Sequence, residues 1–311
     1  MMIESLVLAS EVLNSPDYLK VAVQSADFIW WNQFFKDKKL CRVFLQNHAS
    51  FDAGLEDYAY YASALLSLYD ATGESVWLDR VIALTDIMVS LFWDQHQGGF
   101  FLSPVDMQGG IKRFKSFKDH EVVAANAVAL NVLLRLAKRT SNIAYKDKAV
   151  QLMTVFASFV VADPIDYVGF FSILDEYLNG EFAALQYAAK GNIVVKGVYN
   201  ANQDSVLSIV FDIKPGWHIN AHQPLQDYLV PTRVELMDLP DTVSDIVYPA
   251  GQVKRLGFQA HELALYQGTV KVKMPLKKMT GNIIRIKVKL QACNEQLCLP
   301  PEELLLQVPK S

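Results

Sequence analysis

The sequence predicts a multidomain α + β protein in which a partial (α/α) toroid of αα-hairpins is followed by an immunoglobulin-like β-sandwich. Three observations predict this fold class. Apolar residues recur every three or four positions up to about residue 180, and the spacing changes to two from about residue 192. The length of 311 residues favours two domains over one. We expect the helical domain to span residues 1–182 and the sandwich to span residues 190–311.

The helical half repeats itself. Segments starting at Leu6, Leu65 and Leu133 align without gaps, and in each an aromatic residue opens the second helix of a pair (Tyr18, Trp77 and Tyr145). Self-similarity over a long period indicates stacked αα-hairpins. Apolar residues have helical spacing in residues 6–13, 21–35, 65–68, 81–92, 127–136 and 149–159, and residues 164–178 add one more helix. About seven helices make roughly half of a six-hairpin toroid, so we expect the remainder to come from further sequence or from a second copy in a homodimer.

The C-terminal half reads as strands separated by turns. Residues 193–195, 206–211 and 283–290 are rich in β-branched residues at strand-like spacing. Lys214-Pro215-Gly216 is one of several turn signals between such runs. Eight or so short strands of this kind are typical of an immunoglobulin-like sandwich.

Composition excludes several classes of protein. The chain contains 29 Lys and Arg against 33 Asp and Glu, so it lacks the basic excess of a nucleic-acid-binding surface. No apolar run reaches the ~18 residues of a membrane-spanning helix. The first residues lack the pattern of a signal peptide, so the chain is either cytoplasmic or the downstream part of a longer protein.

Three cysteines are too few for a disulfide scaffold. Cys41 stands alone and is interpreted as a small buried hydrophobe. Cys293 and Cys298 are separated by four residues, and such a loop allows the ~5.5–6 Å Cα separation of a disulfide. A bridge across so short a loop removes little entropy from the unfolded chain, which favours a redox role over a structural one. A zinc site would need four ligands, and none of the possible partners His218, His222 and His261 lies at the spacing of a zinc finger. We expect no metal and no other cofactor.

Several motifs in the helical half resemble the C-terminal helical part of the spermatogenesis-associated thioredoxin-like family. They are Gly54-Leu55-Glu56-Asp57-Tyr58-Ala59, Leu91-Phe92-Trp93-Asp94 with Gly98-Gly99-Phe100-Phe101, and Asn126-Ala127-Val128-Ala129. The resemblance covers about residues 1–180. It implies an (α/α)6 barrel similar to six-hairpin glycosidases and N-acylglucosamine 2-epimerases.

In such barrels the chemistry lies where the inner helices begin. The resemblance therefore makes candidates of His48, Asp52, Glu56, Asp57, Tyr58, Asp119, His120, Glu121 and Asn126. Paired carboxylates serve glycoside hydrolysis, and His with Glu can carry the proton of an epimerisation. The alternative is structural, since acidic residues favour helix N-termini and a buried Asn often satisfies backbone groups. Val123-Ala124-Ala125 also replaces the Pro-Ser-Gly-like turn of the family, so a scaffold or dimerisation domain is favoured over sugar chemistry.

The second half resembles the N-terminal domain of the thiol:disulfide interchange protein DsbD over about residues 190–308. The motifs are Pro215-Gly216-Trp217-His218-Ile219-Asn220, Val247-Tyr248-Pro249, Leu265-Tyr266-Gln267-Gly268, and Gln291-Ala292-Cys293 with Cys298-Leu299-Pro300-Pro301. In that family the domain is periplasmic, accepts electrons from a thioredoxin-like domain and passes them to thiol–disulfide partners. The resemblance implies that Cys293 and Cys298 form the exchanging pair.

The family shields its pair with a loop that carries an aromatic cap. Phe258 occupies a comparable place here, while Tyr248, His218 and Tyr266 are expected to line the site. Each of these could equally be an ordinary packed residue. No basic side chain lies within the cysteine loop to lower the pKa of either thiol. The pair is therefore expected to be attacked by the reactive thiol of a partner.

The sequence thus favours an electron-relay protein that exchanges thiols and disulfides with thioredoxin-fold partners, in the periplasm or otherwise exported. A carbohydrate-active helical domain with an accessory sandwich is the second hypothesis. A non-catalytic interaction scaffold with a structural bridge is the third.

Overall fold

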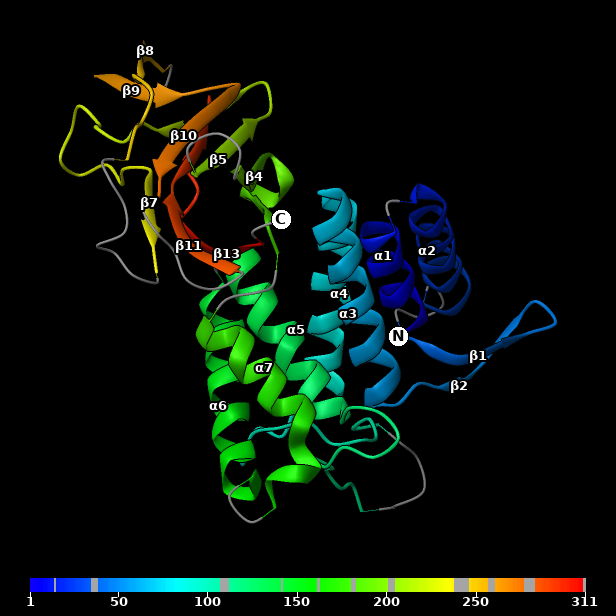
Figure 1. The fold of residues 1–311 in the computed structure, drawn as a ribbon. Helices are drawn as coiled ribbons and strands as arrows, with labels where there is room; N and C mark the ends of the chain where they lie inside the picture. The colour runs from blue at the N-terminus through cyan, green and yellow to red at the C-terminus, as the bar shows by residue number, and fades with distance from the viewer. Residues whose placement is uncertain are drawn as a thin grey trace. The chain divides into compact units, whose positions relative to one another are not determined.

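The computed structural model describes the chain except for residues 14, 35–38, 107–111, 141, 161–162, 180–182, 201–204, 238–245, 257–260, 277–282 and 310–311 (Figure 1). The chain divides into two compact units. The first contains residues 1–137 and 142–174, and the second contains residues 138–141 and 175–311. A helical N-terminal part and a β-rich C-terminal part with antiparallel sheets agree with the coarse fold class that the sequence predicts.

The N-terminal part is built from α-helices. They are α1 (Met2–Val12), α2 (Pro16–Ile29), α3 (Leu55–Thr72), α4 (Ser75–Phe92), α5 (Ala125–Thr140), α6 (Ile143–Val160) and α7 (Val168–Asn179). The expected helix from residue 164 begins as a 3-10 turn, η2 (Pro164–Tyr167), and continues as α7. Helices α1 and α2 pack on each other, as do α3 and α4 (Figure 1). In the second pair, Gly73 ends α3 in the left-handed conformation, which a glycine adopts without steric strain.

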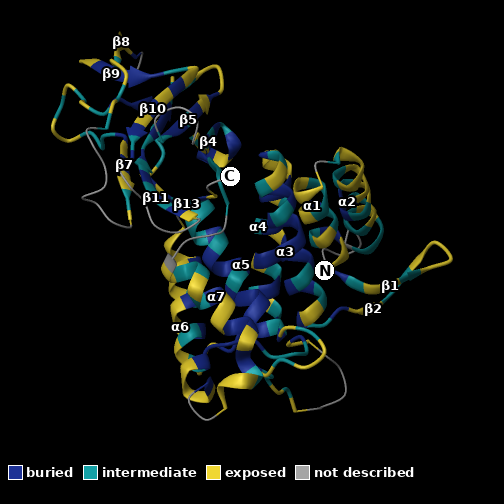
Figure 2. Ribbon diagram, in the orientation of Figure 1, coloured by how far each residue is buried: buried dark blue, intermediate teal, exposed yellow. Residues whose placement is uncertain are grey.

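Burial differs along this part of the chain. Figure 2 shows dark blue, buried residues along α3, α4 and α5, whereas α1 and α2 carry many exposed residues. Of the three aromatic residues that open the second helices, Trp77 and Tyr145 are buried and Tyr18 is 39% exposed. The aromatic residue of the repeat is therefore buried in the second pair of helices, α3 and α4, and in the third pair, α5 and α6, but not in the first pair.

A hairpin between α2 and α3 was not predicted from the sequence. Helix α2 ends at Ile29, and a short π-helix, η1 (Trp30–Phe34), follows it. Strands β1 (Cys41–Leu45) and β2 (His48–Asp52) then pair through a two-residue turn whose residues, Gln46 and Asn47, have φ of 50° and 60°. The prediction that Cys41 is buried is wrong, because it lies on this partly exposed ribbon.

The C-terminal part contains three antiparallel sheets among its described residues. Sheet β10-β5-β4-β3 is formed by β10 (Thr269–Pro275), β5 (Val206–Ile213), β4 (Ile193–Asn200) and β3 (Leu185–Ala188). Sheet β13-β11-β7 is formed by β13 (Glu302–Pro309), β11 (Ile283–Leu290) and β7 (Arg233–Leu236). Sheet β12-β6-β9-β8 is formed by β12 (Ala292–Asn294), β6 (Trp217–Asn220), β9 (Glu262–Tyr266) and β8 (Gln252–Arg255).

These sheets share one apolar core. Buried and exposed residues alternate along β10, β11 and β13, as expected for strands with one face on a core. The core includes Ile209, Phe211, Val272, Ile286, Val288, Leu306, Ile219 and Ala292. The predicted turn at Lys214-Pro215-Gly216 is present, with Gly216 at φ of 82° and the Trp217 N–H bonded to the Lys214 carbonyl. This turn directs the chain from β5 into β6, where His218 lies.

Among the described residues, no helix combines the length and apolar character needed to cross a membrane.

Candidate functional site

The two cysteines of the second unit face each other across a tight hairpin. The chain leaves β11, passes through Gln291, forms β12 and returns through Cys298. The Leu299 N–H bonds to the Ala292 carbonyl at 2.8 Å, and the Asn294 N–H bonds to the Leu297 carbonyl at 2.9 Å. Cys293 and Cys298 lie between these two bonds as an isolated antiparallel bridge, and their sulfurs form a disulfide.

This position explains how close the cysteines lie. Their Cα atoms are 4.0 Å apart, which is less than the separation expected from the sequence. Residues that face each other between hydrogen bonds in an antiparallel pair have Cα atoms about 4.5 Å apart. The hairpin register, rather than the length of the loop, therefore sets the separation.

Polar side chains hold the hairpin in shape. The Asn294 side-chain oxygen accepts hydrogen bonds from the Gln296 and Leu297 N–H groups at 2.8 and 2.9 Å, which forms an Asx-type turn. Gln291 donates to the Leu299 carbonyl at 3.1 Å and accepts from the Asn220 amide at 3.4 Å. Gln291 thereby ties the chain after the second cysteine to β6. Sequence reasoning did not assign roles to these polar residues, although Asn294 in a short loop is a local turn signal.

The two sulfurs belong to residues of different exposure. Cys293 is 1% exposed, whereas Cys298 has intermediate exposure. Exchange begins when an incoming thiolate reaches one sulfur of a disulfide, and the choice of sulfur depends on access. Cys298 is therefore the more exposed residue of the bonded pair.

His218 lies beside the buried cysteine. It is the register partner of Cys293 on the neighbouring strand β6, and it is fully buried. Burial lowers the pKa of His218, while Glu295 acts to raise it and Lys254 to lower it. The structure thus brings together the predicted site residues Cys293, Cys298 and His218.

The predicted aromatic residues have contacts of their own. Tyr266 pairs with Ile219 of β6, and its hydroxyl donates to the Pro249 carbonyl at 2.9 Å. The Tyr248 hydroxyl accepts from the Val234 N–H at 2.9 Å, and its ring stacks on His222 with centroids 3.6 Å apart. Burial raises the pKa of both phenols. Both tyrosines hold the loops around β6 and β9, and their part in lining the site stays a prediction. Phe258, the expected cap, lies outside the described residues.

A buried carboxyl follows the cysteine hairpin at the start of β13. Glu302 is 6% exposed, and its Oε1 accepts the Ala189 N–H at 2.9 Å. Burial raises the pKa of Glu302 from 4.5 to about 7. Unfolding exposes the carboxyl and lets it lose its proton at lower pH, so raising the pH from about 4.5 to 7 favours the unfolded state. The stability of the second unit should therefore fall over this range.

We expect Glu302→Gln to remove this dependence and to stabilise the protein at pH 8 by on the order of 2–3 kcal/mol. Urea unfolding at pH 5 and pH 8 measures the effect. Glu303→Gln is the matched control, because Glu303 is an exposed neighbour that pairs with Lys287 at 3.0 Å and should contribute less than about 1 kcal/mol. If both variants changed stability equally at pH 8, the buried carboxyl would not be the source.

The helical candidates bond mainly to the backbone. Asp57 accepts the Gly54 N–H at 2.9 Å at the start of α3, and the Tyr58 hydroxyl accepts the Leu40 N–H at 2.8 Å. Asp119 accepts the N–H groups of Ala124 and Gly169 at 2.8 and 2.7 Å. The other predicted carboxylates and histidines of this half, His48, Asp52, Glu56, His120 and Glu121, are exposed. Such bonds stabilise loops and helix starts, which is the structural alternative to sugar chemistry.

Asn126 is fully buried in α5 and joins two loops. Its side chain accepts the Phe100 N–H at 2.8 Å and donates to the carbonyls of Phe100 and Ser116 at 3.0 and 2.9 Å. Replacement by Ala leaves these buried groups without partners, which we expect to destabilise the protein by about 2–4 kcal/mol. Thermal unfolding of the full chain measures this. Asn32→Ala, which removes one bond to the Phe28 carbonyl on an exposed helix surface, should have a much smaller effect. Equal effects would contradict a structural role for Asn126.

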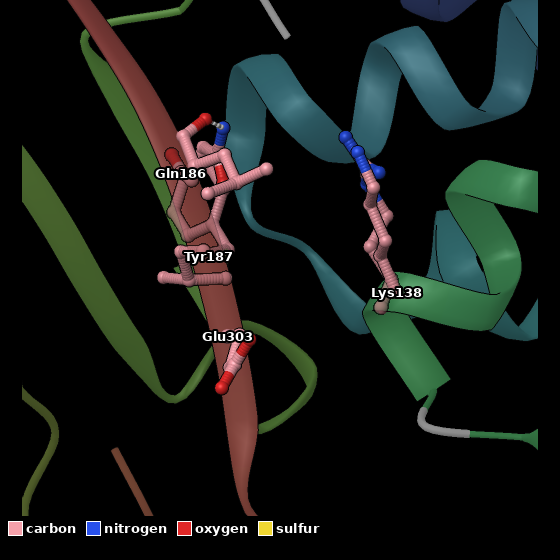
Figure 3. A pocket seen from close by; sticks show the side chains of 7 residues that line it. Lys138, Gln186, Tyr187 and Glu303 are labelled. Carbon is pink, nitrogen blue, oxygen red and sulfur yellow. Dashed lines mark hydrogen bonds between the residues drawn. The ribbon is translucent and has the colours of Figure 1, made fainter. Parts of the chain in front are cut away.

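Figure 3 shows a small pocket in the second unit, with Lys138, Gln186, Tyr187 and Glu303 among its lining residues. Its volume is about 10 Å³, which is room for about one water molecule. A cavity of this size does not hold a sugar or a redox cofactor.

Comparisons with known proteins match the N-terminal part and the C-terminal part of the chain to two different families. Residues 189–310 match the family model described as thiol:disulfide interchange protein DsbD, N-terminal. Spermatogenesis-associated protein 20 of Rattus norvegicus is 39% identical over 112 residues, which make up 36% of this chain. The matched region spans only 14% of the length of that relative. Both resemblances that the sequence motifs suggested are thereby confirmed.

Two solved structures are also similar. The reduced DsbD N-terminal domain of Neisseria meningitidis is 19% identical, with a TM-score of 0.29, over 38% of this chain and 85% of that domain. Cellobiose 2-epimerase of Spirochaeta thermophila is 14% identical, with a TM-score of 0.42, over 64% of this chain and 47% of the enzyme.

Proposed function

We propose that residues 190–311 form an immunoglobulin-like domain that exchanges electrons with thioredoxin-fold proteins through the Cys293–Cys298 pair. One observation carries the proposal. The two cysteines are already bonded in a hairpin of the segment that matches a thiol:disulfide interchange family. Gln291 and Asn294 hold that hairpin in place, which suits a pair that must open and close without loss of the fold.

Reduction of the pair proceeds in two displacements. A donor thiolate attacks the Cys298 sulfur, a bond forms between the donor and Cys298, and the Cys293 sulfur leaves as a thiolate. The second donor thiolate then attacks the donor sulfur of this mixed disulfide and releases Cys298. The donor ends as a disulfide, and the domain gains two electrons and takes up two protons. The same steps in reverse reduce a disulfide partner.

The charges around the hairpin support a passive role for the pair. Glu295 lies in the exposed turn between the two cysteines. A nearby carboxylate disfavours the thiolate form of a cysteine, so neither cysteine of the pair is expected to be a strongly reactive nucleophile. The partner must therefore supply the reactive thiolate that begins the exchange, and thioredoxin-fold dithiols are partners of this kind.

Location follows from the chemistry. A pair that cycles through a disulfide needs an oxidising compartment or one with a dedicated electron supply, and the periplasm is our proposal. In this proposal the helical domain expected from the sequence, residues 1–182, is a partial (α/α) toroid that acts as a scaffold. Pairing of the helical unit with a second copy stays a prediction.

The proposal is tested by incubating the oxidised full chain with a reduced thioredoxin-fold donor under nitrogen. Mass spectrometry after alkylation should show two new thiols at Cys293 and Cys298, with one donor disulfide formed per chain. Circular dichroism should stay unchanged. A pair that stays bonded until the chain unfolds would refute the proposal.

A further inference from the structure

His218 is placed to act on the buried sulfur of the pair. Cross-strand partners in an antiparallel sheet have Cβ atoms about 4.5–5.5 Å apart on the same face. Cys293 and His218 are such partners. Ala292 and Ile219, one position along, point to the opposite face and belong to the main core. His218 and the Cys293 sulfur are therefore neighbours on the face away from that core.

The His218 ring has unused hydrogen-bonding capacity. The imidazole is fully buried, and neither ring nitrogen has a hydrogen-bond partner among the described residues. Buried polar atoms in proteins nearly always have partners. A disulfide sulfur carries no proton, whereas a reduced cysteine has a thiol that an imidazole nitrogen can accept from. Reduction of the pair thus creates the partner that His218 lacks in the oxidised protein.

The surroundings keep this imidazole neutral at ordinary pH. Burial lowers its pKa, and the charged groups that act on it are Glu295 in the hairpin turn and Lys254 on β8. Lys254 is itself bonded to the Gln267 side chain. A neutral imidazole is a proton acceptor, and the thiol that it faces must lose a proton before it can attack.

We propose that His218 takes the proton from the Cys293 thiol when the mixed disulfide is resolved. The inference rests on the proposed exchange function. The Cys293 thiol gives its proton to the imidazole, the Cys293 thiolate attacks the Cys298 sulfur, and the bond between Cys298 and the partner breaks. The partner sulfur leaves as a thiolate, and the imidazolium returns its proton to solvent. In the reverse direction the imidazolium protonates the departing Cys293 thiolate.

The test follows the reaction of the reduced full chain with 4,4′-dithiodipyridine. A Cys41→Ser background leaves Cys293 and Cys298 as the two thiols. Attack by the first thiol releases one thiopyridone, and resolution by the second releases another. Stopped-flow absorbance between pH 5 and pH 9 separates the two steps. In the protein with His218, we expect the resolution rate to level off near neutral pH.

His218→Gln should slow resolution at pH 7 at least about tenfold, because general base catalysis is typically worth about a hundredfold or more. Its rate should keep rising with pH up to 9, as for an unassisted thiol. His218→Phe also removes the proton acceptor, but its apolar ring fills the space of the imidazole. It therefore tests the loss of the base in a variant that keeps the packing. His96→Gln, an exposed histidine of the helical unit, is the matched control and should match the parent protein.

Two outcomes distinguish failure of the proposed role of His218 from failure of the proposed exchange function. Resolution rates in His218→Gln and His218→Phe within twofold of the parent at every pH would overturn the role of His218 and leave the exchange function standing. Absence of a second thiopyridone from the parent protein would overturn the exchange function itself.

Discussion

Replacing both Cys293 and Cys298 by serine is expected to lower electron transfer from a thioredoxin-fold donor to a disulfide acceptor by at least about a hundredfold, because no sulfur remains to form the mixed disulfide. The assay follows acceptor thiols with the full chain in catalytic amount. Loss of the bridge should cost about 2 kcal/mol of stability, so circular dichroism at the assay temperature must show a folded variant.

The control for this experiment is Cys41→Ser. Cys41 lies on β1 in the helical unit and is not part of the bonded pair. We expect this variant to transfer electrons within twofold of the parent rate. Transfer that survives in the double serine variant, or that is lost with Cys41, would contradict the assignment of the pair.

The single cysteine variants should differ strongly from each other. Cys293→Ser keeps the accessible sulfur of Cys298 and removes the sulfur that resolves the intermediate, so a mixed disulfide with an oxidised partner should accumulate. Cys298→Ser keeps the sulfur of Cys293, a residue that is 1% exposed, and should form at least about tenfold less of the adduct. Non-reducing electrophoresis measures both yields with a partner whose single nucleophilic cysteine carries a thionitrobenzoate disulfide, so that thionitrobenzoate leaves when the mixed disulfide forms. Equal yields, or the reverse order, would contradict the direction of attack.

Local sequence patterns predicted much of this fold because they act over short distances. The spacing of apolar residues located α3 to α6, and the alternation along residues 283–290 located β11. Lys214-Pro215-Gly216 predicted the turn into β6 because proline and glycine each fix a particular backbone conformation. The cysteine pair was visible as two thiols across a short loop.

The remainder depends on contacts that a local pattern does not encode. Residues 41–52 form a hairpin around Gln46 and Asn47, a pair with weaker turn preference than Asn-Gly or Asp-Gly. Helical spacing through residue 35 concealed the end of α2 at Ile29. The spacing of the cysteines suggested a wider Cα separation than the 4.0 Å that the strand register imposes.

The candidate site likewise depends on contacts that local sequence patterns do not encode. Motif resemblance placed His218 near the pair, but only the register between β6 and β12 makes it the neighbour of Cys293. The bond from Gln291 to Leu299 and the buried carboxyl of Glu302 likewise depend on strands meeting in three dimensions. Asp57, Asp119 and Asn126 looked like candidates for sugar chemistry, yet each bonds to main-chain groups of a neighbouring loop or helix start.

The central claim is that the Cys293–Cys298 bond opens and closes reversibly in the folded protein. An equilibrium redox titration of the full chain, with thiols trapped and counted by mass spectrometry, tests it most directly. We predict a reversible two-electron transition within the roughly −120 to −270 mV range of exchange proteins, with unchanged circular dichroism. A bond that resists reduction down to about −300 mV, or that breaks only as the sheets unfold, would show that the bridge is structural.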